Sequence, residues 1–377
     1  MHRELIEFAA GVPGPASAWI WRPAALRERA AALRRVLPSW TILYAQKANK
    51  ALSDAAVDVV DGIECASREE VVRALAVGAR RVAVAGPVKS PGFLRWLQGL
   101  DHPGIRLHAE GWEELRALAD TGWTGPLALR VNAGEALSAT ATHHMQGAVP
   151  FGFSLEEAGR ALRWALGNGL EVDGFAHHAM SNCLDAAEYA EHVDRALRVS
   201  ADLAGDVVDL GYVNVGGGLG ADPRGETIDL ERLGALLPAP PAGVELACEP
   251  GRFLAAPAGY YLTEVVDLKR NGGVDFAVVR GGTHHFRLPA AWGYGHPFTV
   301  VPVERWDRPW ARREVSGTVR VCGELCTPRD VLHPGRAVES LRVGDRLLMG
   351  DAGAYGLDIS HTGFLSNRPP ETYTVSW

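Results

Sequence analysis

The strongest constraint on the fold is a series of short, nearly continuous apolar segments that alternate with amphipathic stretches between about residues 40 and 250. We interpret the apolar segments as β-strands at 41–45, 59–65, 81–86, 105–109, 127–132, 172–178, 207–215 and 244–248. Strands without polar alternation are typical of parallel sheets that are covered on both faces. Eight strands separated by helices predict an α/β fold, a (β/α)8 TIM barrel, with a doubly wound sheet as the structural alternative.

Signals for helix starts lie between these strands. Ser67-Arg68-Glu69-Glu70 has the pattern of a capping box, in which side chains satisfy the first backbone N–H groups of a helix. Further helices are predicted to begin near residues 110 and 154, and the longest to span 184–204. This alternation places the residues that follow the strands on one rim of the barrel.

The pattern changes after residue 258. Runs at 260–268, 275–280, 297–305, 315–322, 345–349 and 372–377 read as strands separated by turn residues. They predict a mainly antiparallel C-terminal β domain of residues 258–377, which residues 1–20 join, whereas residues 21–257 form the barrel domain. Residues 281–296 read as a long loop rich in histidine, glycine and aromatic residues, and ordered loops of this length are often functional.

The composition excludes several classes of protein. The chain has 377 residues, enough for two domains, and its formal net charge of −7 provides no basic stripe for nucleic acid. We find no apolar run of about 18 residues, the length that a membrane span needs. The first residues lack an apolar signal core, and the five cysteines form no C-x-x-C pair. We therefore expect a cytoplasmic protein without structural zinc.

Lys47 ends the first apolar segment, in Tyr44-Ala45-Gln46-Lys47. A strand end of this kind can hold an amine where a carbonyl group reaches it. A desolvated lysine near other cationic groups loses its proton more readily and can form a Schiff base. Taken alone the pattern is more often that of a solvated loop lysine. The other strand ends therefore decide between the two interpretations.

Two later strand ends offer groups for an anion and for a cationic ring. Gly216–Gly218 follow the seventh strand, and consecutive glycines let backbone N–H groups approach an anion closely. Glu249 follows the eighth strand, and Arg252 comes three residues later, where its guanidinium could reach the same anion. A flexible turn and a surface ion pair would produce the same two patterns, so each is informative only in combination.

The remaining strand ends complete the combination. His177 and His178 follow the sixth strand, Glu64 ends the second, and Arg130 lies in the fifth. A histidine pair without a third ligand at a recognisable spacing does not indicate a metal, but a flat imidazole can stack on a planar ring. A lysine, an anion cradle, an arginine, a carboxylate and an imidazole on one rim fit pyridoxal 5′-phosphate, an aldehyde-bearing, phosphorylated, aromatic cofactor.

These segments resemble, in order along nearly the whole chain, those of the fold-type III pyridoxal-phosphate decarboxylases, which include the diaminopimelate, ornithine and arginine decarboxylases. The segments that carry the resemblance are 44–49, 64–67, 178–181, 216–218, 249–252, Cys326 with Asp330, and 350–355. Their joint occurrence is far more specific than any one of them. The resemblance implies a barrel with a C-terminal β domain, and a homodimer whose active sites are shared across the interface.

The resemblance also implies roles for individual residues. Lys47 would hold the cofactor as an internal aldimine, His178 would stack on its ring, and Glu249 would keep the ring nitrogen protonated. The substrate amine would displace Lys47 to give an external aldimine, and loss of the α-carboxylate would give a quinonoid. The groups expected around the cofactor, including its phosphate, are Glu64, Arg130, Ser181, Gly216, Gly217, Gly218, Gly251, Arg252 and Tyr355.

Other residues are expected to act from the second subunit or on the substrate. By the resemblance, Cys326 protonates the decarboxylated intermediate and Asp330 meets the distal polar group of the substrate. Arg287, Arg329 and Arg368 are candidates for binding additional carboxylates. The chain departs from the family pattern at Glu64, where aspartate is commoner, at Ala176, at Ala179-Met180 and in the segment 322–325, and these departures leave the substrate open.

One branch of the family shares two further segments with this chain. His284–Pro289 and Gly295–Phe298 resemble decarboxylases of carboxylate-siderophore biosynthesis, which act on a diamino acid already joined to citrate or a similar acid. Diaminopimelate, ornithine and carboxynorspermidine-type decarboxylation remain alternatives. Alanine racemases use an arginine where this chain has Glu249, and cofactor-free regulatory relatives tend to lose the lysine or the phosphate clamp, so both fit less well.

Overall fold

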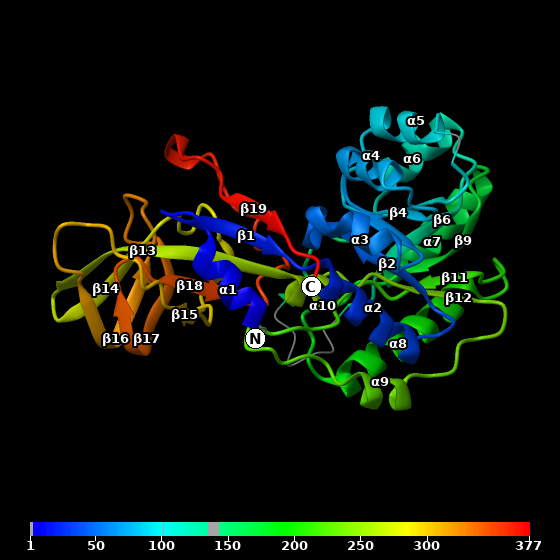
Figure 1. Cartoon of the computed structure of the whole chain (residues 1–377). Helices are drawn as coiled ribbons and strands as arrows, with labels where there is room; N and C mark the ends of the chain where they lie inside the picture. The colour runs from blue at the N-terminus through cyan, green and yellow to red at the C-terminus, as the bar shows by residue number, and fades with distance from the viewer. Residues whose placement is uncertain (1–2, 101, 135–142) are drawn as a thin grey trace. The chain divides into compact units, whose positions relative to one another are not determined.

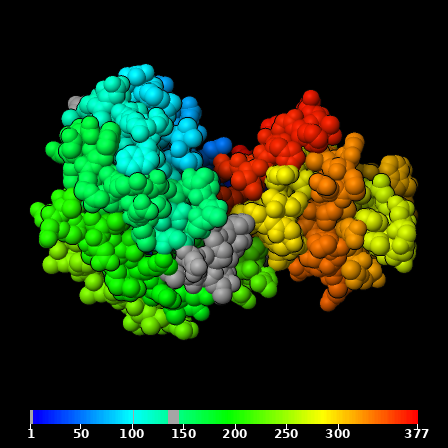
Figure 2. Space-filling view, turned by 180° about the vertical axis from the view of Figure 1, so that it is seen from behind, coloured from blue at the N-terminus to red at the C-terminus, as the bar shows by residue number. Residues whose placement is uncertain are grey.

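The computed structural model describes residues 3–100, 102–134 and 143–377 (Figure 1). It divides into two compact units. The barrel unit comprises Leu26–Asp222 and Glu226–Leu254, and the β unit comprises Met1–Ala25, Pro223–Gly225 and Ala255–Trp377. In the space-filling view the barrel unit is coloured mainly from blue through cyan to green, and the β unit mainly yellow, orange and red (Figure 2). The domain limits expected from the sequence stay a prediction.

Eight parallel strands of the described residues close into a barrel. In chain order they are β2 (Thr41–Ala45), β3 (Gly62–Cys65), β4 (Val82–Val84), β5 (Ile105–Ala109), β6 (Leu127–Asn132), β9 (Val172–Ala176), β11 (Tyr212–Asn214) and β12 (Glu245–Cys248). Each pairs with its neighbour, β12 pairs with β2, and the β5–β6 pairing completes the ring. The predicted TIM barrel is confirmed, and the doubly wound alternative is wrong because a doubly wound sheet has open edges.

Helices surround the barrel on its outside (Figure 1). They are α2 (Pro23–Val36), α3 (Ser53–Val57), α4 (Arg68–Ala76), α5 (Pro91–Gln98), α6 (Trp112–Thr121), α7 (Leu155–Gly167), α8 (Ala186–Ala204), α9 (Leu230–Leu236) and α10 (Arg252–Ala255). The Ser67 and Ser154 hydroxyls cap α4 and α7 by accepting from the N–H groups of Glu70 and Glu157. Both helix starts agree with their capping patterns. Two short strands, β7 (His143–His144) and β10 (Met180–Ser181), pair with each other, and β8 (Phe153–Ser154) pairs in parallel with the end of β6.

The core of the barrel unit lies between the strands and the helices. Buried aliphatic side chains such as Val84, Leu107 and Leu129 pack against helix residues such as Leu94 and Leu162. Full burial of one such side chain contributes about 1.5–3 kcal/mol. This two-sided burial is the reason that the strands read as continuous apolar runs.

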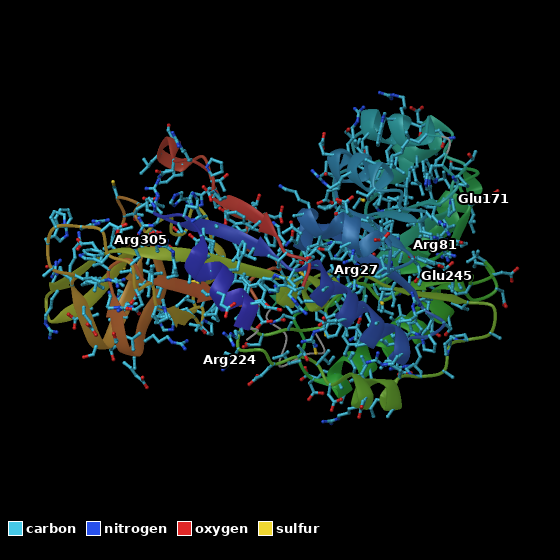
Figure 3. All side chains as sticks on the ribbon, viewed as in Figure 1. Arg27, Arg81, Glu171, Arg224, Glu245 and Arg305 are labelled. Atoms are coloured by element: carbon cyan, nitrogen blue, oxygen red, sulfur yellow. The ribbon has the colours of Figure 1, made fainter. Side chains whose placement is uncertain are left out.

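Ion pairs connect the amino ends of the barrel strands. Arg81, just before β4, pairs with Glu245 at the start of β12, and both are labelled in Figure 3. The Thr41 hydroxyl donates to the same Glu245 carboxylate at 2.6 Å. Both partners of the ion pair are partly exposed, so it contributes no more than about 1 kcal/mol. This end of a TIM barrel supports the fold, whereas the carboxyl ends of the strands carry functional side chains.

The β unit is built on a mixed sheet. Its order is β15 (Thr299–Val301), β18 (Arg346–Met349), β13 (Gly259–Asn271), β14 (Val274–Val279), β16 (Glu314–Cys322) and β17 (Val331–Arg342), and β1 (Ser17–Trp21) pairs with β13 and with β19 (Glu371–Thr374). The β14–β16 and β1–β19 pairings are parallel, and the others are antiparallel. Helix α1 (Arg3–Gly11) packs on it through Leu5 and Ala9.

Two features of the β unit differ from the expectation. Strand β17 was not among the predicted strands, yet it passes through Pro334 and Gly335 with register shifts in its pairing to β16. The long loop 281–296 contains a short helix, α11 (Leu288–Trp292). Among the helices of the described ranges, none combines the length and the apolar character that a membrane span requires.

Candidate active site

A cavity of about 220 Å³ opens at the carboxyl ends of the barrel strands. Six residues selected from the sequence line it, each from a different strand end or strand: Lys47, Glu64, Arg130, His178, Gly216 and Glu249. Because the strands are parallel and closed, residues far apart in the chain meet at this rim. The structure therefore brings together the central part of the predicted site.

Lys47 lies in a 3₁₀ turn (Gln46–Ala48) directly after β2. Its Nζ is 2.8 Å from Oε2 of Glu64, a side chain that β3 holds fully buried. The other carboxylate oxygen of Glu64, Oε1, has no hydrogen-bond partner among the described residues. An unsatisfied acceptor in a buried cavity favours a ligand that carries a hydrogen-bond donor or a positive charge.

The glycine loop lies against His178. Gly217 donates its N–H to Nδ1 of His178 at 3.1 Å, so the proton of the neutral imidazole is on Nε2. Desolvation lowers the pKa of His178 well below its ordinary value, and Arg130 and Lys47 lower it further. The ring is therefore neutral in this wall of the cavity.

Only glycine fits at the first positions of this loop. Gly216 has φ +73°, and a Cβ there would lie 2.7 Å from Nδ1 of His178. A Cβ on Gly217 would lie 2.7 Å from the backbone oxygen of Glu249. The close approach brings the backbone of the loop next to the imidazole and the acid, as an anion cradle requires.

Glu249 is buried at the end of β12. Its Oε1 accepts a hydrogen bond from Nδ2 of Asn214 at 2.8 Å. Burial raises the pKa of Glu249 to about 7, and Glu64 also raises it, whereas Lys47 and Arg130 lower it. Because burial disfavours the charged form of this carboxyl group, a cationic ligand in the cavity would stabilise its ionised form.

Arg130 lines the cavity and is held by Glu110, a partner that the sequence did not reveal. Its Nη1 donates to both carboxylate oxygens of Glu110, each at 2.9 Å. Its guanidinium carbon lies 4.8 Å from the centroid of the Phe151 ring. The second nitrogen, Nη2, is buried and has no hydrogen-bond partner among the described residues, so a donor remains for a ligand.

A second buried ion pair lies behind this wall. Nζ of Lys89 is 2.7 Å from Oε1 of Glu114, and both side chains are almost fully buried. Lys89 also donates to the carbonyl oxygens of Gly86 and His108, at 2.8 and 2.9 Å. Gly86 in turn donates its N–H to Glu110. Lys89 thereby fixes the cavity wall after β4, although its sequence context gave no signal.

Other predicted residues lie next to the cavity in the barrel unit. Gly251 packs against the first strand end, since a Cβ there would lie 3.0 Å from that of Ala48. Arg252 is buried at the start of α10. Ser181 lies in β10, two residues before Cys183, whose N–H donates to the Gly218 carbonyl at 2.8 Å. Their expected contacts with a phosphate stay predictions.

His177 does not share the role of His178. Its Nε2 is 2.8 Å from the hydroxyl of Ser200 on α8, and burial lowers its pKa to about 3. It therefore links β9 to a helix as a neutral side chain. Among the residues that the structure describes, no group of three or more His, Cys, Asp or Glu side chains could hold a metal ion.

The remaining predicted residues belong to the β unit. Asp330 is buried, and it accepts from the N–H groups of Thr283 and Leu325 at 2.6 and 2.8 Å. Cys326 is exposed, and so are Arg287, Arg329 and Arg368; Tyr355 has φ +60° and is partly buried. Asp330 thus has a structural role in connecting two loops of the unit. The catalytic and substrate-binding roles of these residues stay predictions.

Comparison with known proteins agrees with this geometry. The family model for the pyridoxal binding domain of pyridoxal-dependent decarboxylases matches residues 24–256. The chain is 34% identical to the 2-[(L-alanin-3-ylcarbamoyl)methyl]-2-hydroxybutanedioate decarboxylase of Staphylococcus aureus. The aligned 348 residues cover 87% of this chain and 86% of the relative. It is 32% identical to the diaminopimelate decarboxylase of Deinococcus radiodurans, over 90% of this chain and 85% of that enzyme.

Solved structures share the fold. Diaminopimelate decarboxylase from Helicobacter pylori, in complex with L-lysine, superimposes with a TM-score of 0.85 at 22% identity, covering 98% of this chain and 93% of that one. The arginine decarboxylase of Paramecium bursaria Chlorella virus gives 0.86 at 19% identity over the whole of both chains. At these identities the similarity shows the architecture alone.

Proposed function

This chain belongs to the pyridoxal-dependent decarboxylases, and we propose that its substrate is a 2,3-diaminopropionate unit joined through its side-chain nitrogen to citrate. The enzyme would remove the α-carboxylate of the amino-acid unit. The observation that supports a decarboxylase site is the cavity with Lys47 and Glu249 among its walls. The citrate conjugate is supported by the 34% identity to the staphylococcal decarboxylase.

The residues of the cavity fit pyridoxal 5′-phosphate. Buried polar atoms of Glu64 and Arg130 have no hydrogen-bond partner among the described residues, and the glycine loop brings backbone close to the cavity. When bound, the cofactor supplies a carbonyl that condenses with amines and a ring that accepts the electron pair left by carbon dioxide. Lys47 is the amine that would hold it.

Each residue then has a defined task. Glu249 would hold the proton at the ring nitrogen by electrostatic attraction, and His178 would cover one ring face. Gly217 and Gly218, with Ser181, Arg252 and Tyr355, would bind the phosphate. The thiol of Cys326 would donate a proton to the α-carbon after carbon dioxide has left.

We place the enzyme in the cytoplasm as a homodimer with shared sites. A catalytic thiol at Cys326 needs a reducing compartment, and the five cysteines are free in the described structure. Cys326, Arg329 and Arg287 are exposed in the chain, so a second subunit could use them. In this arrangement Arg287 and Arg329 would bind the distal carboxylates of the citrate moiety, and Asp330 would meet another distal polar group of the substrate.

Release of carbon dioxide from candidate substrates tests the proposal. The enzyme should release carbon dioxide faster from citryl-diaminopropionate than from diaminopimelate, ornithine or carboxynorspermidine at equal concentration. Lys47→Ala should release none and should lose the absorbance of protein-bound pyridoxal 5′-phosphate, whereas the exposed neighbour Lys50→Ala should retain both. A preference for diaminopimelate would instead favour the alternative that the 32% identity to the Deinococcus enzyme supports.

A further inference from the structure

Asn214 connects the glycine loop to the buried acid. It is the last residue of β11, and its side chain is fully buried. Its Oδ1 accepts from the N–H of Gly216 at 2.7 Å. Its Nδ2 lies 2.8 Å from Oε1 of Glu249 and 2.9 Å from the hydroxyl oxygen of Tyr212. One amide therefore contacts the loop, the acid and a buried tyrosine.

The contact with Gly216 fixes the orientation of the amide. A backbone N–H can only donate, so the atom that faces it must be the carbonyl oxygen of Asn214. The NH₂ group then faces Glu249 and Tyr212, and it has only donors to offer. Glu249 consequently accepts a hydrogen bond from this NH₂ group. Such a bond is stronger when the acid is ionised, so it favours the ionised form.

The same logic fixes the tautomer of His108, a residue of β5. Because the Tyr212 oxygen accepts from Asn214, its own O–H is available to donate to Nε2 of His108, 3.4 Å away. Burial lowers the pKa of His108 well below its ordinary value, with Arg106 and Lys89 adding to the effect, so the ring is neutral. Its single proton then lies on Nδ1, which is 3.7 Å from Oε1 of Glu249.

Tyr212 is held from the other side as well. The guanidinium carbon of Arg106 lies 3.9 Å from the centroid of the Tyr212 ring, and Arg106 pairs with Asp173. Burial raises the pKa of Tyr212, so its hydroxyl stays protonated and can donate. The ring is therefore fixed while its hydroxyl completes the chain of hydrogen bonds.

We propose that Asn214, Tyr212 and His108 are positioning residues that keep Glu249 ionised for the ring nitrogen of the cofactor. Asn214 donates to Oε1 of Glu249, His108 turns its Nδ1 proton toward the same oxygen, and Tyr212 fixes the orientation of both. The inference rests on the proposed function, since it concerns the acid that holds that proton. It assigns three residues to the site that neither the motifs nor the comparisons select.

The charged neighbours of Glu249 explain why such donors are needed. Glu64 on β3 opposes ionisation of Glu249, whereas Lys47 after β2 and Arg130 on β6 favour it. Cys248 and Tyr189 also lie nearby, but burial raises the pKa of both, and they stay neutral. Lys47 and Arg130 are each engaged by another carboxylate, Glu64 and Glu110 respectively. The attraction of these two cations for Glu249 is therefore weakened by their own carboxylate partners. The neutral donors add to the stabilisation of the ionised Glu249.

Titration of Glu249 in protein freed of cofactor tests the inference directly. The infrared band of its protonated carboxyl is identified by its absence from Glu249→Gln. In Asn214→Leu the band should persist to higher pH than in the unmodified protein, by about one pH unit, because a hydrogen bond to the charged acid is lost. In Tyr212→Phe the band should move in the same direction, because the donor that fixes the His108 proton on Nδ1 is removed. The acid limb of the pH–rate profile of carbon dioxide release should move in the same direction.

Tyr189→Phe is the matched control. Tyr189 is also a fully buried tyrosine of the barrel unit, but its hydroxyl has no hydrogen-bond partner among the described residues. Its variant should titrate like the unmodified protein. If the Glu249 carboxyl titrates with the same midpoint in Tyr212→Phe and Asn214→Leu as in Tyr189→Phe, the inference is wrong. If their midpoints shift but the unmodified enzyme decarboxylates no amino acid, the proposed function fails and the assignment of the three residues stands.

Discussion

At the scale of single residues, the two buried acids of the cavity have different partners. Glu64 pairs with a cation, Lys47, whereas Glu249 accepts from a neutral amide. An ion pair within the protein balances the charge of Glu64, although its Oε1 keeps no hydrogen-bond partner, whereas Glu249 lacks a comparably close cation among the described residues. This asymmetry indicates which acid is prepared for a positive charge brought by a ligand.

The stability of the cofactor-free protein should therefore depend on Glu249. Its pKa is about 7 in the folded protein against an ordinary 4.5, so between these values the folded state binds more protons than the unfolded state. The free energy of unfolding should fall as pH rises through this window, by roughly 3 kcal/mol in total. Glu249→Gln should remove this decline.

Denaturant unfolding at several pH values measures the effect. Glu113→Gln is a suitable control, because this glutamate is exposed and lies on the surface of α6. An unchanged pH slope in Glu249→Gln would show that the acid is not the group that titrates.

The sequence indicated the residues that line the cavity, but it did not indicate the buried residues that hold them in place. Lys47 and Glu249 could be selected because each follows an apolar run, and such a pattern is visible in a short stretch of sequence. Lys89 and His108 could not, because their importance comes from partners that the fold brings together, Glu114 and Glu249. Asn214 adjoined the glycine run, and this position was the one available signal for it.

At the scale of elements, the strand ends and the loops after them determine the shape of the cavity. The bounds of β2, β5 and β6 agree with the predicted runs, because burial on both faces keeps most of their residues apolar. Strand β17 was missed because few of its residues are fully buried and it includes a proline and a glycine. Pairing with β16, rather than an intrinsic preference, makes this segment a strand.

The glycine loop after β11 should not tolerate a side chain. In Gly217→Ala the added methyl group would lie 2.7 Å from the Glu249 backbone oxygen, so the loop must move away from the acid. We expect at least about tenfold weaker binding of pyridoxal 5′-phosphate, a loss of about 1.4 kcal/mol. Binding is measured by quenching of tryptophan fluorescence. Gly111→Ala is the control, since a Cβ at Gly111 meets no atom within 4 Å. Equal affinities of the two variants would contradict the prediction.

The loop after β4 should depend on Lys89 for its stability. Lys89→Met leaves the buried carboxylate of Glu114 without its cation, and breaking a buried pair in this way costs about 3–5 kcal/mol. The midpoint of denaturant unfolding measures the loss. The double variant Lys89→Met with Glu114→Leu should recover much of it, because no charge is then left uncompensated. If the double variant is as unstable as the single one, packing rather than charge is responsible.

At the scale of the whole molecule, the proposed dimer makes each site depend on two chains. Mixing Lys47→Ala with Cys326→Ala subunits at random gives half heterodimers, and each of these has one intact site of two. About a quarter of the wild-type activity should therefore return. The carbon dioxide assay, applied before and after subunit exchange, measures it. No recovery above the separate variants would mean that one chain builds its own site.

The sheet of the β unit takes strands from both ends of the chain. Strand β1 lies between β13, which follows the barrel, and β19, which ends at Thr374. During synthesis the barrel strands can pair as soon as they emerge, but β1 must wait with its edges uncovered until these later segments leave the ribosome. A nascent chain stalled before residue 371 would therefore present one uncovered edge of an apolar strand to chaperones after its barrel strands have paired.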